Sequence, residues 1–125
     1  MWIEANPNPV NNLTDDCVIR AISIILDADW LWVFDELCKI ARASYDIQIS
    51  NNVWPKLLKR EGFNRYILPD TCPDCYTVRR FCREHQNGQF ILATGSHVIA
   101  VIDGDYYDTW DSGFEVPIYY YERRT

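Results

Sequence analysis

The chain has 125 residues, of which 48% are hydrophobic, and it carries a formal net charge of −6. This length is enough for a real hydrophobic core, and we expect a single domain over residues 1–125. The acidic balance argues against nucleic-acid binding through a broad basic face. No apolar run approaches the ~20 residues needed to cross a bilayer, so we expect no membrane-spanning segment.

The first 13 residues are rich in asparagine and proline, and they predict an extended arm or loop. They lack the basic segment and the apolar stretch of a signal peptide. Five cysteines is an odd number. Without an export signal, we interpret all five as reduced thiols in a cytoplasmic protein.

Four helices are predicted from apolar residues at helical spacing and from residues that cap helix ends. They are expected over about Asp16–Leu26, Trp30–Tyr45, Val53–Glu61 and the segment from Thr77 to Gly88. The first of them contains a run of isoleucines, which favours almost complete burial.

Five strands are predicted, most of them after the last helix. They are expected over Phe63–Leu68, Gln89–Ala93, Ser96–Ile102, Asp105–Trp110 and Val116–Tyr121. Helices that come first and an antiparallel sheet that comes second are typical of the α+β class.

A hairpin is predicted around Asp103 and Gly104, a pair that accepts positive φ in a two-residue turn. If Ile102 pairs with Asp105, the alternation of side chains places His97 and Asp108 on one face as diagonal neighbours. A hydrogen bond between them is then within reach. A turn with one more residue would bring Asp111 to that face instead.

Cys17 lies in the first turn of the first predicted helix. Unpaired N–H groups and the helix dipole lower the pKa of a thiol there, and the thiolate is the nucleophilic form. Asp15 and Asp16 would oppose this effect unless their carboxylates turn outward or cap the helix. The alternative is that Cys17 is a small buried helix residue without chemistry.

A cysteine at a helix start, a histidine opening a strand and an aspartate on the next strand follow one another as Cys17, His97 and Asp108. This order resembles the papain-like cysteine peptidases. The pair Asp16-Cys17 is similar to the helix start of the branch that processes bacteriocin leaders, and Asp108-Thr109-Trp110 is similar to the Asn-Ser-Trp of papain. The chain also resembles small proteins of phages and prophage-bearing bacteria.

The resemblance implies a papain-like fold and a thiol hydrolase that cleaves a peptide or isopeptide bond in a protein or peptide substrate. Cys17 would be the nucleophile, His97 the general base and then the general acid, and Asp108 the orienting carboxylate. Where the family has a glutamine before the cysteine, this chain has Asn11 and Asn12, either of which would help to hold the oxyanion. The same residues would serve acyl transfer. No cofactor is expected.

Two further hypotheses stay open. The scaffold could be a non-catalytic adaptor or inhibitor. It could also be a zinc-stabilised interaction module, since Cys72, Cys75, Cys82 and His85 have a spacing similar to that of a zinc knuckle. We expect no bound metal, because Cys82 also fits an apolar helix stripe. The sequence leaves the oligomeric state open.

Overall fold

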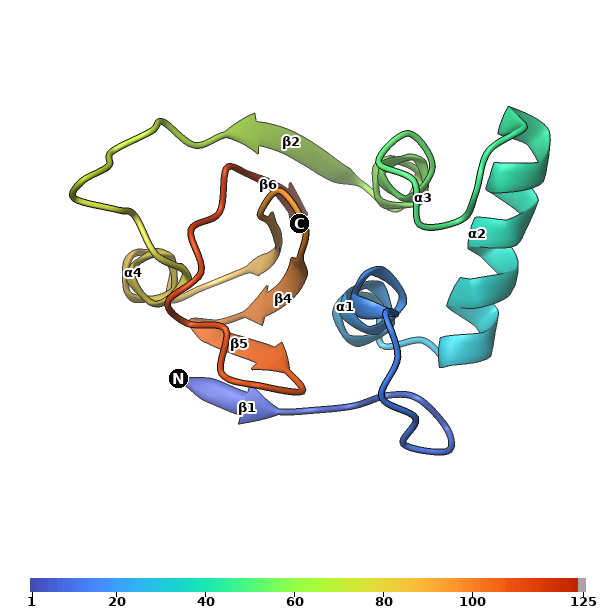
Figure 1. Cartoon of the computed structure of the whole chain (residues 1–125), viewed down its shortest axis with the longest axis horizontal. Coiled ribbons are helices and arrows are strands. Elements are labelled where there is room, and N and C mark those ends of the chain that lie inside the picture. Colours follow the sequence, from blue (N-terminus) through green and yellow to red (C-terminus); the bar gives the residue numbers. More distant parts are fainter. Residues whose placement is uncertain (124–125) are drawn as a thin grey trace.

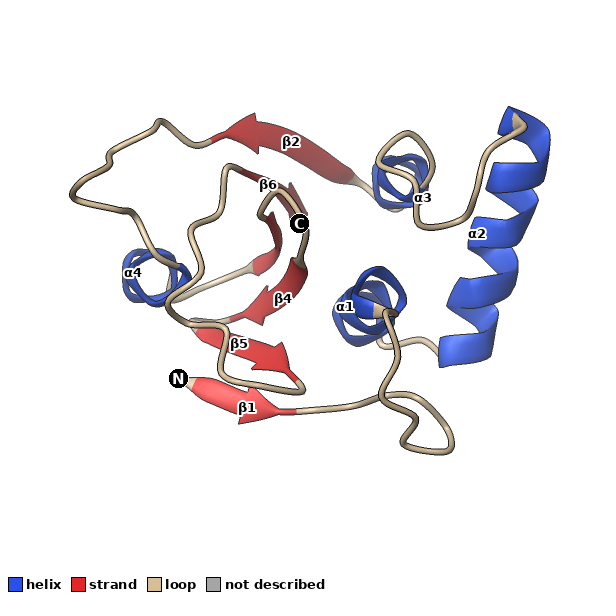
Figure 2. Cartoon of the chain, in the orientation of Figure 1, coloured by secondary structure: helices blue, strands red, loops and turns tan. Residues whose placement is uncertain are grey.

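A six-stranded sheet separates two layers of helices in the computed structural model, which describes residues 1–123 (Figures 1 and 2). Helices α1, α2 and α3 lie on one side of the sheet and α4 lies on the other. The elements in chain order are β1 (Trp2–Glu4), α1 (Cys17–Leu26), α2 (Trp30–Ser44), α3 (Trp54–Arg60), β2 (Phe63–Ile67), α4 (Val78–Glu84), β3 (Gln89–Ala93), β4 (Val98–Ile102), β5 (Asp105–Asp108) and β6 (Tyr119–Arg123). The expected α+β class is confirmed.

Helix α1 lies between the sheet and α2, which explains why it is apolar almost all round. Ile22 and Ile25 are 0% and 1% exposed. The helix ends at Asp27, whose left-handed φ of 51° lets its N–H reach the carbonyls of Ser23 and Ile24. Within residues 1–123, no helix combines the length and the apolarity that crossing a membrane requires.

The strand order is β1-β5-β4-β3-β6-β2, and the sheet is mixed. Strand β1 runs parallel to β5, with Trp2 opposite Tyr106. The expected arm or loop over residues 1–13 is therefore wrong for Trp2–Glu4 and right for the residues after them, and the expected purely antiparallel sheet is wrong. The first residues pair with the open edge of β5, whose backbone groups would otherwise lack partners there.

The β4–β5 hairpin has the predicted register. Ile102 pairs with Asp105 and Ala100 with Tyr107. Asp103 and Gly104 both have positive φ, at 49° and 83°, as a two-residue turn of this kind requires.

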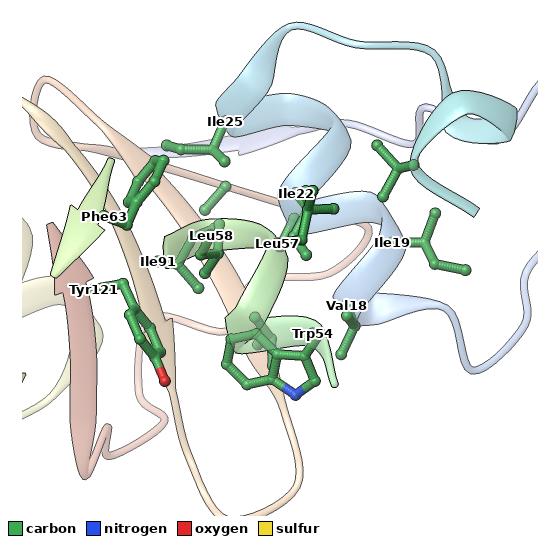
Figure 3. Packing of buried hydrophobic residues seen from close by; sticks show 14 of the residues in the cluster. Val18, Ile19, Ile22, Ile25, Trp54, Leu57, Leu58, Phe63, Ile91 and Tyr121 are labelled. Atoms are coloured by element: carbon green, nitrogen blue, oxygen red, sulfur yellow. The ribbon is translucent and has the colours of Figure 1, made fainter. Parts of the chain in front are cut away.

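Two apolar clusters hold the layers together, one on each face of the sheet. The larger cluster joins α1, α2 and α3 to the sheet, and Figure 3 shows its labelled members, Val18, Ile19, Ile22, Ile25, Trp54, Leu57, Leu58, Phe63, Ile91 and Tyr121. The smaller cluster joins α4 to the opposite face and contains Val78, Phe81, Cys82, Phe90, Leu92, Ile99, Val101 and Tyr106. Helix α4 therefore packs on the sheet apart from the other three helices.

Several element ends differ from the sequence-based expectation. Helix α3 begins only at Trp54, and α4 ends at Glu84 because His85 leaves the helical conformation. The predicted cap at Thr77 is confirmed, since its hydroxyl accepts a hydrogen bond from the backbone N–H of Arg80. Strand β6 begins at Tyr119, three positions later than expected.

Candidate active site

Cys17 is the first residue of α1, and its side chain is half-buried at the wall of a cleft of about 430 Å³. Asp16 occupies the N-cap position, but its carboxylate makes no capping hydrogen bond. It accepts instead from the guanidinium of Arg20 and from the indole N–H of Trp30, at 2.9 Å for the latter. The negative charge of Asp16 is thus compensated away from the thiol.

The cleft opens between the start of α1 and the ends of several strands, so segments far apart in the sequence form its walls. Its lining consists of Leu13, Thr14, Asp15, Cys17, Val18, Arg20, Ile49, Asn51, Thr94, Gly95, Ser96, His97, Val98, Thr109, Trp110 and Tyr119. A cleft of this size can admit a short stretch of a peptide or a small ligand.

His97 is held by the tight turn between β3 and β4. The Thr94 hydroxyl accepts hydrogen bonds from the backbone N–H groups of Ser96 and His97, at 3.2 and 2.9 Å. The Thr94 N–H in turn donates to the His97 carbonyl at 2.8 Å. The ring of Trp110 lies over the imidazole, with 5.1 Å between the two ring centroids. The side chain of His97 is therefore fixed and only 11% exposed.

Asp108 ends β5 and is the hydrogen-bond partner of His97. Its Oδ2 lies 2.6 Å from His97 Nε2 and also accepts from the Ser112 hydroxyl at 2.8 Å. Its Oδ1 accepts from the Thr109 N–H at 2.8 Å. The predicted hydrogen bond between His97 and Asp108 is confirmed. Because Asp108 holds Nε2, Nδ1 is the ring nitrogen left for the thiol.

The route by which His97 and Asp108 meet differs from the predicted one. If side chains kept alternating along β4 and β5, those of His97 and Asp108 would both point toward α4. Ile99, two positions after His97, does pack on that face of the sheet. Both side chains interact with α1 instead, His97 with Cys17 and Asp108 with Arg20. The β4–β5 ladder stops at Ala100 and Tyr107, so it does not set side-chain directions at these two positions.

The electrostatics of Cys17 and His97 favour charge separation. Burial raises the pKa of Cys17, but hydrogen bonding to the His97 ring and to the Val98 N–H, with the charges of His97 and Arg20, brings it below its ordinary value. Burial lowers the pKa of His97, and the bonds to Asp108 and Cys17 raise it to about 9. Both shifts favour a thiolate facing an imidazolium, the pair that a thiol nucleophile requires.

Arg20 is a member of the site that the sequence analysis missed. Its side chain is 9% exposed and lies between Asp16 and Asp108, with Nη2 3.5 Å from Asp108 Oδ1. An arginine buried among isoleucines, three residues after the cysteine, is the signal in the sequence that could have found it.

Three other predicted positions lie away from the thiol. Asn11 and Asn12 are exposed in the loop before α1 and do not line the cleft. Asn11 adopts a left-handed φ of 53°, and the loop folds back on Asn8. The expectation that either amide holds an oxyanion therefore lacks the geometry it needs. Asp111 accepts from the Tyr106 hydroxyl and from the Gly113 N–H and does not contact His97.

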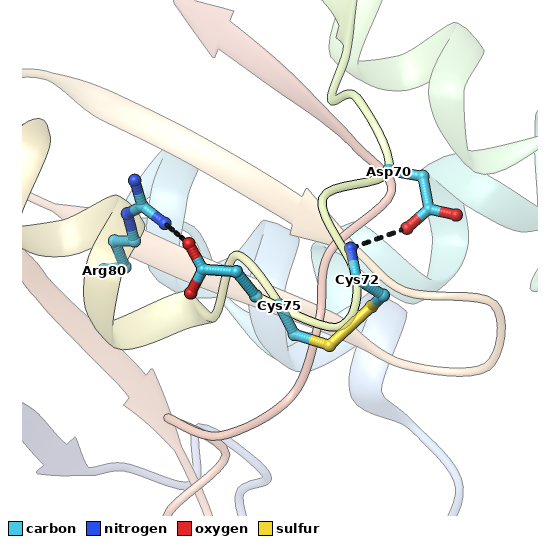
Figure 4. The surroundings of a disulfide bond; sticks show 5 residues. Asp70, Cys72, Cys75 and Arg80 are labelled. Carbon is cyan, nitrogen blue, oxygen red and sulfur yellow. Dashed lines mark hydrogen bonds and ion pairs between the residues drawn. A yellow bond between two sulfur atoms is a disulfide. The ribbon is translucent and has the colours of Figure 1, made fainter.

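The structure does not assemble the zinc ligand set. Cys72 and Cys75 form a disulfide in the loop before α4, where the spacing of three residues brings their Cα atoms to 4.4 Å (Figure 4). The expectation of five reduced thiols is wrong for these two. Cys82 is buried in the smaller cluster, and the ring of His85 stacks on Phe81. Residues 1–123 contain no group of three or more side chains arranged to hold a metal ion.

Comparisons of this chain with protein-family models, with curated proteins and with solved structures found no match. We therefore infer function from the geometry of Cys17, His97, Asp108 and Arg20 alone.

Proposed function

We propose that the chain is a papain-like thiol hydrolase that cleaves a peptide or isopeptide bond. One observation carries this proposal: Cys17, with a lowered pKa, lines an open cleft beside His97, which in turn bonds to Asp108 at 2.6 Å. Nucleophilic acyl chemistry needs a thiol that contacts an imidazole and a carboxylate that orients the imidazole.

In the first half of the reaction, the Cys17 thiolate attacks the carbonyl carbon and forms a tetrahedral oxyanion. His97, as the imidazolium, donates its Nδ1 proton to the leaving nitrogen. The C–N bond then breaks, an amine departs and a thioester remains on Cys17. The backbone N–H of Cys17 has no acceptor within the first turn of α1 and is a candidate donor to the oxyanion.

In the second half, neutral His97 takes a proton from water, and the hydroxide attacks the thioester carbon. The C–S bond breaks, releasing a carboxylic acid and regenerating the thiolate. An amine in place of water would give acyl transfer by the same steps. Asp108 holds the imidazole in one orientation throughout, while Ser112 and Thr109 hold Asp108.

The test is the reactivity of the thiol. Brief treatment with iodoacetamide at pH 6, followed by peptide mapping, should label Cys17 faster than Cys38 on α2 or Cys82. Cys82 is a useful internal reference, because burial raises its pKa to about 11. The variant His97→Gln should remove most of the difference in labelling rate between Cys17 and the other two thiols. If Cys17 labels no faster than Cys38, the enzyme proposal fails, and a non-catalytic binding protein becomes the better hypothesis.

A further inference from the structure

One of the polar side chains that line the cleft and that the proposed chemistry does not use is the amide of Asn51. Asn51 is exposed in the turn before α3 and lines the same cleft as Cys17. We infer that the Nδ2 group of Asn51 donates a hydrogen bond to a carbonyl oxygen of the bound peptide. This inference rests on the proposed function, since it assigns a residue that binds the substrate of that site.

The orientation of the Asn51 amide is set by its neighbour Trp54. The Asn51 Oδ1 lies 2.9 Å from the indole Nε1 of Trp54. An indole N–H can only donate, so the amide oxygen must face it and the NH₂ group must face the other way. No described residue accepts a hydrogen bond from that NH₂ group. Two donors are therefore available at the cleft wall.

Trp54 is a rigid anchor for this arrangement. It is 0% exposed, and its ring packs edge-on against Tyr121 at a centroid distance of 5.6 Å. Figure 3 shows its indole within the larger cluster, with the nitrogen at the edge of the labelled side chains. An amide held by a fixed donor loses little conformational freedom when it binds a ligand, which makes it a better recognition group than a free surface asparagine.

The remainder of the cleft indicates what the amide would bind. Large apolar side chains from three separate segments line it while staying exposed: Leu13 at 78%, Ile49 at 43% and Trp110 at 45%. Such walls suit apolar side chains of a peptide, and the peptide's backbone carbonyls supply the acceptors that an amide donor needs. Among the described lining residues, Asn51 is the one carboxamide, and neither Asn11 nor Asn12 shares the cleft.

The probe for this inference is acetyl-Leu-Leu-norleucinal, an apolar peptide aldehyde. Its carbonyl carbon adds reversibly to the Cys17 sulfur, and its oxygen takes the proton to give a hemithioacetal. Binding is measured as protection of Cys17 from iodoacetamide. Asn51→Ala should weaken binding by about three- to tenfold, the value of one neutral hydrogen bond. The labelling rate of each variant without aldehyde is measured alongside, so that protection is judged against the variant's own unprotected rate. The matched control is Asn52→Ala, an exposed neighbour that does not line the cleft.

A second variant tests the anchor. Trp54→Phe keeps an aromatic ring in the core but removes the N–H, so the Asn51 amide loses its fixed orientation. It should weaken aldehyde binding, and the double variant with Asn51→Ala should bind no more weakly than Asn51→Ala alone. Thermal melting shows that each variant is folded at the temperature of the assay.

The outcomes separate this inference from the proposed function. If Cys17 of the unmodified chain lacks enhanced reactivity, the proposed function fails. If Cys17 is reactive but Asn51→Ala binds the aldehyde as tightly as the unmodified chain, the role of Asn51 is overturned. The same holds if the aldehyde gives no protection, or if Asn52→Ala weakens binding as much as Asn51→Ala does.

Discussion

Arg20 Nη2 lies 3.5 Å from Asp108 Oδ1 and links the first helix to the end of β5, across 88 positions of sequence. Arg20 also pairs with Asp16 on its own helix, and both of its partners are almost fully buried. The guanidinium therefore balances two buried carboxylates and holds the Asp108 carboxylate in place, with Oδ2 facing His97. It is a positioning residue for the candidate triad.

Replacing Arg20 with methionine should reduce both stability and thiol reactivity. Asp16 and Asp108 would be left as buried charges without their cation, so the free energy of unfolding in urea should fall by about 3 kcal/mol. Iodoacetamide labelling of Cys17 should also slow, because the charge of Arg20 helps to lower the pKa of that thiol. The control is Arg42→Met at the exposed end of α2, which should change neither value. An Arg20→Met variant with normal Cys17 labelling would contradict the positioning role.

The two aspartates near the end of β5 should respond differently to substitution. Asp108→Asn keeps an oxygen that can accept the His97 N–H, so much of the Cys17 reactivity should remain. Asp108→Ala removes the acceptor and should lose far more. Asp111→Ala breaks the bonds to Tyr106 and Gly113 and should lower stability while sparing reactivity. Labelling rates and unfolding in urea would measure both effects. If Asp111→Ala slowed labelling and Asp108→Ala did not, Asp111 would be the residue that orients the imidazole.

The pH dependence of labelling should report the thiolate. As the pH falls through the lowered pKa of Cys17, the sulfur takes up a proton and labelling slows. In His97→Gln this limb should move toward the ordinary thiol value, since the hydrogen bond and the positive charge are both lost. A limb at the same pH in both proteins would show that His97 does not act on the thiol.

Peptide turnover should have an alkaline limit as well. His97 must hold a proton to release the leaving amine, and its pKa is raised to about 9, so turnover should decline above that pH. Asp108→Asn removes a negative charge that raises this pKa, and the alkaline limit should shift to lower pH. The measurement is kcat/KM from pH 5 to 10 with a cleaved peptide. An alkaline limit that does not move would separate Asp108 from the titration of His97.

Local sequence determined the elements that carry the candidate site. The isoleucine spacing indicated the helix that begins at Cys17, and Asp103-Gly104 indicated the turn that sets the β4–β5 register. These features depend on residues a few positions apart, whose helical or alternating pattern is visible in the chain itself. The hydrogen bond between His97 and Asp108 was predicted from that register, but the two side chains meet beyond the end of the ladder, where alternation no longer applies.

Only the tertiary structure decided what surrounds these residues. The parallel pairing of β1 with β5, the buried position of Arg20 and the entry of Asn51 into the cleft all join segments that are distant in the sequence. No local periodicity encodes such contacts, because they depend on how the layers pack rather than on the spacing within one element. The sequence thus determined where a thiol, an imidazole and a carboxylate occur, and packing decided that they meet at one cleft beside a buried arginine.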